Sequence, residues 1–78
     1  MQEQRQLTYG EKACGISFNP DNRSDVDALK RNFAELVDLL NEHRIHATSP
    51  EIGRMLSIAI TEVQTAQMWG VKAITWKF

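Results

Sequence analysis

Hydrophobic residues recur along two long stretches of the chain at the spacing of one helix face. The first stretch carries an apolar stripe at Val26, Leu29, Phe33, Leu36 and Leu40, which Val37 and Leu39 widen. The second carries a stripe at Ile52, Leu56, Ala59, Val63, Ala66 and Ala73. Intervals of three and four residues are typical of helices that pack lengthwise on other helices. The pattern therefore predicts long helices over residues 24–45 and 50–75.

Polar residues at the start of each stretch indicate where these helices begin. Ser24, with Asp27 three residues later, resembles a capping box. Ser49-Pro50-Glu51 combines a hydrogen-bonding cap, a proline suited to the first helical position and an acid in the first turn. Because the link over residues 46–49 is short, we expect the two helices to form an antiparallel hairpin.

The first part of the chain carries weaker signals. Residues 1–6 are polar and are expected to be disordered. Residues 7–16 predict one or two helical turns, although they contain Gly10 and Gly15. Residues 17–23 predict a turn, because proline and its neighbours there disfavour a helix. The expected fold is a single all-α domain over residues 1–78, a short N-terminal helix or turn followed by the hairpin.

A chain of 78 residues buries too little surface for a secure core unless something else supports it. Its lone cysteine, Cys14, excludes an internal disulfide. The second helix also carries more apolar residues than one partner helix can cover, namely Ile58, Ile60, Met68, Trp69, Val71, Ile74 and Trp76. We expect this surplus to form a subunit interface in a homo-oligomeric helical bundle.

Composition and charge narrow the possible partners. Nine Lys and Arg residues against ten Asp and Glu give a net charge of −1, which argues against DNA as a partner. The apolar runs are too short to span a bilayer, so no membrane role is expected. Residues 1–15 lack the hydrophobic segment of a secretory signal. Together with the lone thiol, this predicts a cytoplasmic protein.

Few residues suggest enzyme chemistry. The segment GEKACGIS, residues 10–17, nearly matches a phosphate-binding loop, but Ile16 takes the place of its lysine and no strand precedes it. His43 and His46 lie three residues apart, without the further ligands of a metal site, and are expected at the surface. Cys14 is expected to pack as a small hydrophobe. We therefore expect no catalytic residues, no metal and no cofactor.

A small polar face on the second helix allows two interpretations. Arg54, Ser57 and Thr61 are spaced so that they share this face. In the first interpretation, Ser57 and Thr61 bond to carbonyls of their own helix and Arg54 pairs with Glu51. In the second, the guanidinium and the hydroxyls hold an anion such as phosphate.

Four segments resemble a small phage hairpin-domain family that includes the anti-CBASS and anti-Thoeris signal sponges. They are ACGISFNPD at 13–21, DVDALK at 25–30, IAITEVQTAQMW at 58–69 and VKAITW at 71–76. The most specific part is Thr61 to Thr65 followed by Met68-Trp69. The resemblance implies a homo-hexamer that binds cyclic nucleotides between its subunits without cleaving them. Such a sponge lowers the free signal that bacterial immune cyclases produce.

The resemblance also implies roles for individual residues. Phe18 stands where relatives commonly carry a base-stacking tyrosine, Lys30 matches a cation that meets phosphate, and Arg54 matches an arginine used for cyclic trinucleotides. This chain departs from the pattern because Phe18 lacks the hydroxyl and the turn before Lys30 is shorter. The expected ligand-binding residues are Phe18, Asn19, Pro20, Lys30, Arg54, Ser57 and Thr61. Cyclic dinucleotides, cyclic trinucleotides and cyclic ADP-ribose isomers are the expected ligands. The alternative is a helical oligomer that acts through protein contacts.

Overall fold

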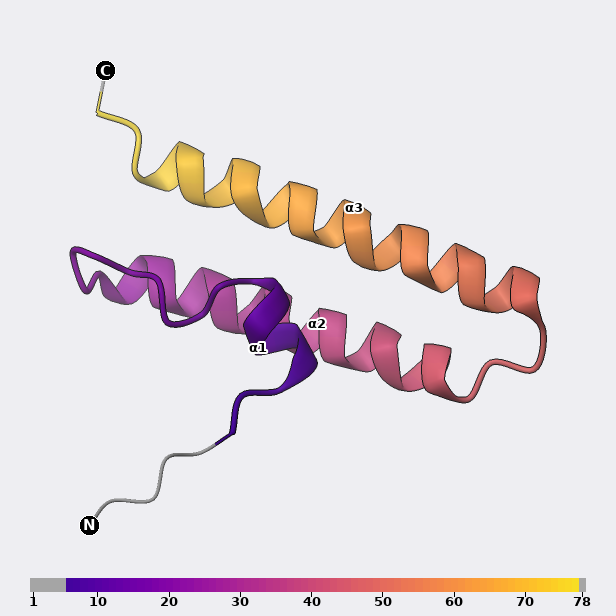
Figure 1. Ribbon diagram of the computed structural model, residues 1–78. Coiled ribbons are helices and arrows are strands. Elements are labelled where there is room, and N and C mark those ends of the chain that lie inside the picture. The colour runs from indigo at the N-terminus through magenta and orange to yellow at the C-terminus, as the bar shows by residue number, and fades with distance from the viewer. Residues whose placement is uncertain (1–5, 78) are drawn as a thin grey trace, which may run out of the picture.

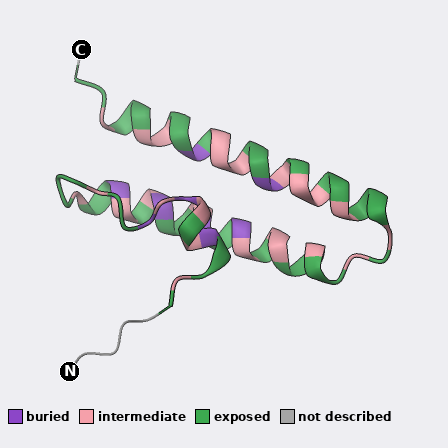
Figure 2. Ribbon diagram, in the orientation of Figure 1, coloured by how far each residue is buried: buried purple, intermediate pink, exposed green. Residues whose placement is uncertain are grey.

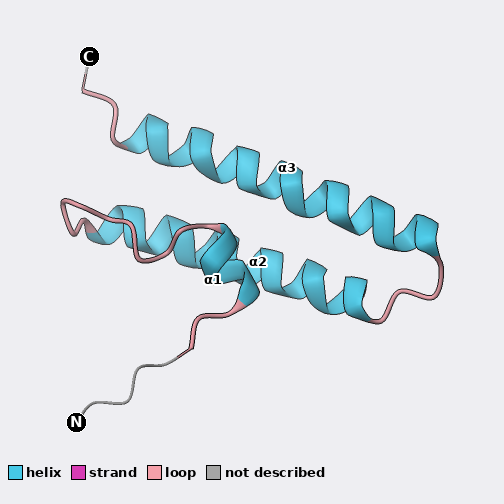
Figure 3. Ribbon diagram, in the orientation of Figure 1, coloured by secondary structure: helices cyan, strands magenta, loops and turns pink. Residues whose placement is uncertain are grey.

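Three helices form the structure, a computed structural model that describes residues 6–77. Helix α1 spans Tyr9–Ala13, α2 spans Ser24–Ile45 and α3 spans Pro50–Ile74. The two long helices run antiparallel, and α1 lies across α2 (Figure 1). The described residues contain no strand (Figure 3). The predicted all-α class, a short first helix followed by a hairpin, is confirmed. Disorder was predicted for residues 1–6, of which residues 1–5 lie outside the described residues.

Helix α1 begins with a capping box that the sequence analysis did not identify. The Thr8 hydroxyl accepts from the Glu11 amide at 3.1 Å, and the Glu11 carboxylate accepts from the Thr8 amide at 2.8 Å. Asp38 of α2 holds the same end of α1, because its carboxylate accepts from the Thr8 hydroxyl and from the Gly10 amide, both at 2.7 Å. A β-carbon on Gly10 would lie 2.1 Å from the Ala34 carbonyl oxygen. Only glycine allows α1 to approach α2 this closely.

The start of α2 differs from the predicted capping box at Ser24. Ser24 is the first helical residue, the cap position is Arg23, and the Arg23 side chain makes no capping hydrogen bond. Asp27 pairs with Arg31 at 2.7 Å. The cap is held from outside the helix, because the Asn19 amide group donates to the Arg23 carbonyl at 2.7 Å and accepts from the Arg23 amide at 3.1 Å. This turn replaces the local cap that the sequence suggested.

Helix α3 begins as its sequence predicts. The Ser49 hydroxyl accepts from the Ile52 amide at 3.3 Å, and Pro50 takes the first helical position. The helix ends at Ile74, where the Thr75 hydroxyl donates to the Val71 carbonyl at 2.7 Å. The link to α2 is short, so the two helices are forced back against each other.

The core lies where α1, α2 and α3 meet. It consists of the buried residues Cys14, Ile16, Ala34, Val37 and Ile60. The predicted stripes need correction, because Leu36 of the first stripe is 42% exposed and Ile52 of the second is 38% exposed. Ile60, which was assigned to the surplus, is only 2% exposed. Helix α2 is contacted by α1 as well as by α3, so its buried line shifts to Val26, Lys30, Ala34 and Val37.

Much of the apolar surface of α3 is exposed (Figure 2). The exposed residues of the predicted surplus are Ile58, Met68, Trp69, Ile74 and Trp76. The molecule measures 44 × 42 × 12 Å, so it is about one helix diameter thick. Within the described residues, no helix has the length and apolarity required to cross a membrane.

Candidate functional site

A groove of about 490 Å³ lies between the C-terminal half of α3 and the segment that joins α1 to α2. Lys12 and the turn after α1 form one wall, together with Phe18. Lys30 rises from α2, and Gln67 and Lys72 come from α3. The groove therefore combines three ammonium groups, one aromatic ring and one amide. This combination suits a ligand that carries both negative charge and flat rings.

Lys30 is the central cation of the groove, and it also holds the groove together. The whole residue, side chain included, is only 5% exposed. The ammonium donates to the Gly15 carbonyl at 3.0 Å and to the Phe18 carbonyl. Gly15 has a φ of +59°, which glycine adopts without the steric cost that most side chains meet there, so the turn favours this residue. An ammonium has three N–H donors, so one is left for a ligand.

Phe18 presents an aromatic face beside this ammonium. Phe18 is 70% exposed, and the ammonium nitrogen of Lys30 lies 5.4 Å from the centre of its ring. An exposed ring held next to a cation can stack on a base while the cation meets a phosphate. Phe18 and Lys30, which the sequence analysis assigned to one site, therefore lie together as that assignment requires.

Asn19 and Pro20 line a smaller cavity of about 210 Å³, which shares Phe18 and Lys30 with the groove. Both oxygen and nitrogen of the Asn19 amide group already bond to the backbone of Arg23. Arg23 in turn donates to the Ile74 carbonyl at 3.0 Å and pairs with Asp25. This pairing lowers the pKa of the Asp25 carboxyl, chiefly through the hydrogen bond from Arg23. Asn19 thus shapes the turn that presents Phe18.

Arg54, Ser57 and Thr61 lie in the N-terminal half of α3, away from this groove (Figure 1). Arg54 pairs with Glu51 at 2.5 Å, and the Thr61 hydroxyl donates to the Ser57 carbonyl at 3.1 Å. For these two residues the first interpretation of the sequence is confirmed. The Ser57 hydroxyl differs, because it accepts from Arg44 of α2 at 3.1 Å. The seven predicted residues therefore separate into two groups, one around Phe18 and Lys30 and one in the N-terminal half of α3, and their binding roles stay predictions.

Among the groove residues that were not predicted from the sequence, three carry polar side chains, namely Lys12, Gln67 and Lys72. The Lys72 ammonium lies 5.1 Å from the ring centre of Trp69 and 5.7 Å from that of Trp76. Gln67 follows Ile60 by seven residues on the buried line of α3 and is itself buried. A polar residue on a buried helix line is the signal that would have identified it.

Cys14 also borders the groove and packs in the core as predicted, with 3% of its surface exposed. Burial is the main cause of a raised pKa for its thiol, and nearby Asp38 raises it further. A neutral, buried thiol is a poor nucleophile. Cys14 therefore contributes shape to the groove rather than reactivity.

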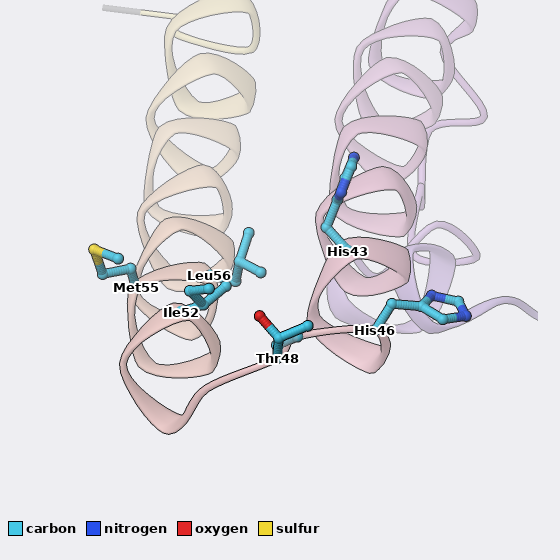
Figure 4. Close-up of a pocket in the computed structure, with 7 residues that line it drawn as sticks. His43, His46, Thr48, Ile52, Met55 and Leu56 are labelled. Carbon is cyan, nitrogen blue, oxygen red and sulfur yellow. The ribbon is translucent and has the colours of Figure 1, made fainter.

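The two histidines lie near the opposite end of the hairpin. They border a pocket of about 440 Å³ together with Thr48, Ile52 and Met55. Figure 4 shows the rings of His43 and His46 pointing in different directions. His46 Nδ1 lies 2.9 Å from the Glu42 carbonyl oxygen, so it is occupied by its own helix. No cluster of three potential metal ligands occurs among residues 6–77.

A thin helical hairpin with a basic, aromatic groove defines a small ligand-binding module. The model of the family described as Acb2/Tad1, hairpin domain, matches residues 11–75, and the chain belongs to this family of phage anti-CBASS and anti-Thoeris sponges. The resemblance found in the sequence is therefore confirmed. Membership implies a role as a nucleotide sponge. No curated protein and no solved structure matches the chain.

Proposed function

We propose that this protein sequesters cyclic oligonucleotide immune signals and releases them uncleaved, with cyclic dinucleotides bound in the groove of Phe18 and Lys30. The observation that carries the proposal is the exposed Phe18 ring beside the Lys30 ammonium, in a groove that Lys12 and Lys72 make basic. A cyclic dinucleotide presents two phosphates and two bases, so cations and a stacking plane are both needed. The net charge of −1 does not oppose this, because a small ligand meets only the local charge.

The interaction strengths are sufficient for a sponge. A hydrogen bond to a charged group contributes ~1.5–3 kcal/mol, and a stacked base contributes ~1–3 kcal/mol. A few such contacts, repeated by symmetry, reach about 12 kcal/mol, which corresponds to a nanomolar Kd. A stoichiometric sponge needs this affinity because it has no turnover with which to compete against an effector.

A homo-oligomer, as in the hexamers that the family forms, completes the proposal. The exposed Trp69 of α3 and Trp76, which follows the end of α3, support it, because large apolar surfaces on so thin a molecule favour burial by further copies. Met68, which is 61% exposed, lines the groove beside this surface, so a neighbouring copy would enclose the ligand. The site of action is the cytoplasm of the infected host.

A second ligand site is proposed at Arg54, Ser57 and Thr61 for cyclic trinucleotides. The Arg54 side chain is 62% exposed, and its ion pair with Glu51 lies at the surface. Ion pairs between exposed side chains are weak because water screens them, so a phosphate can replace Glu51 at small cost. Cyclic ADP-ribose isomers also carry two phosphates and an adenine, and the Phe18 groove is the site proposed for them.

A thermal-shift screen against cyclic dinucleotides, cyclic trinucleotides and cyclic ADP-ribose isomers tests the proposal. Ligands that raise the melting temperature are then recovered after denaturation and examined by mass spectrometry, where they should be intact. Native mass spectrometry gives the number of subunits and of ligands in the same sample. No shift with any of these ligands would favour the alternative function, an oligomer that acts through protein contacts, for which the exposed apolar surface of α3 is equally suited.

A further inference from the structure

We propose that Gln67 is the residue that determines base specificity in the groove, where its side-chain amide binds the Hoogsteen edge of adenine. The inference rests on the proposed function, because it assigns a role at the same site. It concerns which base is chosen, whereas Phe18 and the lysines contact any base and any phosphate.

Gln67 is a buried amide whose hydrogen-bonding groups are not used by the fold. The residue is only 6% exposed, and across residues 6–77 no hydrogen bond to its side chain is found. In the described part of the chain, every side-chain nitrogen or oxygen atom that is inaccessible to solvent has a hydrogen-bond partner. The amide of Gln67 therefore opens onto the groove that it lines. Buried amides without partners are rare in proteins, and such a group calls for a partner that is absent from the protomer.

The surroundings of Gln67 indicate what kind of partner this is. Phe18 supplies the stacking plane in the same groove, and Lys12, Lys30 and Lys72 supply positive charge for phosphates. A neutral amide adds little to the binding of a phosphate where three ammonium groups are available. The remaining part of a nucleotide that needs donors and acceptors together is the edge of its base.

The chemistry of the amide favours adenine. A glutamine side chain offers an acceptor oxygen beside a donor nitrogen in one plane. Adenine presents a donor beside an acceptor, so the two pair through two parallel hydrogen bonds. On its Hoogsteen edge guanine presents two adjacent acceptors, N7 and O6, which leave the donor-acceptor pair of the amide half unpaired. The Watson–Crick edge of guanine places O6 beside N1–H and would pair fully, so the inference applies to the Hoogsteen edge. Adenine read on this edge should bind more tightly than guanine.

The test compares full-length wild type with two variants in isothermal titration calorimetry, with cyclic di-AMP and cyclic di-GMP as probes. Wild type should bind cyclic di-AMP about 10–100-fold more tightly than cyclic di-GMP. Gln67→Met keeps the length and helix preference of the side chain but removes the amide, and should bring this ratio close to one. Gln67→Glu, whose carboxylate has acceptors only, should lower the affinity for cyclic di-AMP more than the affinity for cyclic di-GMP. Gln64→Met is the matched control, because Gln64 does not line the groove, and should keep the wild-type ratio.

The outcomes separate this inference from the proposed function. A wild-type preference for guanine, or an adenine preference that survives in Gln67→Met, would overturn the role of Gln67 and leave the sponge function standing. Wild type that binds neither probe nor any other cyclic nucleotide would overturn the sponge function, and the inference with it. Native mass spectra of the variants report whether a lost ratio comes with a lost oligomer. That result would assign the amide to a subunit contact and overturn the inference.

Discussion

The ammonium of Lys30 lies 5.4 Å from the centre of the Phe18 ring and donates a hydrogen bond to the carbonyl oxygen of the same residue. One side chain thus both builds the turn and supplies the charge beside its aromatic face. The free energy of folding and that of ligand binding are therefore linked at this position. Substitutions in the groove separate into those that change both and those that change binding alone.

Replacing Lys30 with alanine should abolish detectable cyclic-dinucleotide binding, with Kd rising about 100-fold or more, because a charged hydrogen bond and the local potential are both lost. The variant should also melt at a lower temperature, since the Gly15 and Phe18 carbonyls lose their donor. Calorimetry and thermal melts measure the two effects, and native mass spectrometry should still find the oligomer. Lys77→Ala, the same charge change outside the groove, is the control. Unchanged affinity in Lys30→Ala would contradict the assignment of the site.

Phe18→Ala should change binding alone. The ring is mostly exposed, so its removal should leave the free energy of unfolding within about 0.5 kcal/mol of wild type. Loss of a stacked base costs ~1–3 kcal/mol, which raises Kd about 5–150-fold. Phe18→Tyr, which keeps the plane, should bind at least as well as wild type. Equal affinities for Ala, Phe and Tyr at this position would show that no base stacks there.

Arg54→Ala should weaken cyclic-trinucleotide binding selectively and leave cyclic-dinucleotide affinity unchanged, because Arg54 lies away from the groove. Its ion pair with Glu51 is at the surface, so stability should hardly change. Glu51→Gln, which releases the arginine, should tighten trinucleotide binding. Calorimetric titrations with one ligand of each class measure these effects. An equal loss for both classes in Arg54→Ala would contradict two separate sites.

Gly10→Ala and Gly53→Ala should have opposite effects on stability. A β-carbon on Gly10 meets the Ala34 carbonyl at 2.1 Å and the Asp38 carboxylate at 2.8 Å, so α1 must move away. We expect a loss of about 2–4 kcal/mol, at or above the usual cost of overpacking. Gly53 lies within α3 with nothing within 4 Å of the new carbon, so alanine there should add about 0.5–1 kcal/mol. Urea unfolding measures both, and a Gly10→Ala variant as stable as wild type would rule out the close contact of α1 and α2.

Stability should fall in alkali through Cys14. Burial raises the pKa of this thiol above its ordinary value of 9.0, so the folded state holds the proton more tightly than the unfolded chain does. The resulting contribution is complete below pH 9.0 and is lost as pH rises through the folded pKa. Urea unfolding between pH 7 and 10 should therefore show a stability difference between wild type and Cys14→Ala that shrinks with pH. A difference that stays constant would mean that the thiol does not titrate with folding.

The helical hairpin could be read from the sequence because its causes are local. The cap formed by Ser49 and Pro50 involves only neighbouring residues, and it forms as expected. The cap predicted at Ser24 failed because Asn19, from the preceding turn, holds the backbone of Arg23 instead. Propensities within the helix carry no information about this turn.

The site was predictable only in part, for the same reason. Phe18 and Lys30 could be paired through the family resemblance, and the structure brings them together. Gln67 and Lys72 reach the groove because of the position of α3 along the axis of α2 and the place where α1 crosses α2. Gly70 lies at this contact, since a β-carbon there would lie 3.1 Å from Leu29. Such alignment is set by packing between distant segments, which a periodic pattern does not encode.

The 12 Å thickness of the molecule has a consequence for its backbone amides. In a layer one helix thick, every helix turn of an isolated protomer faces water on at least one side, so slow amide exchange would be confined to the short core around Val37 and Ile60. Any covering layer would slow exchange only on the face that it covers. Hydrogen–deuterium exchange along α3, read turn by turn with and without a cyclic dinucleotide, would therefore map which face meets another copy and which meets the ligand.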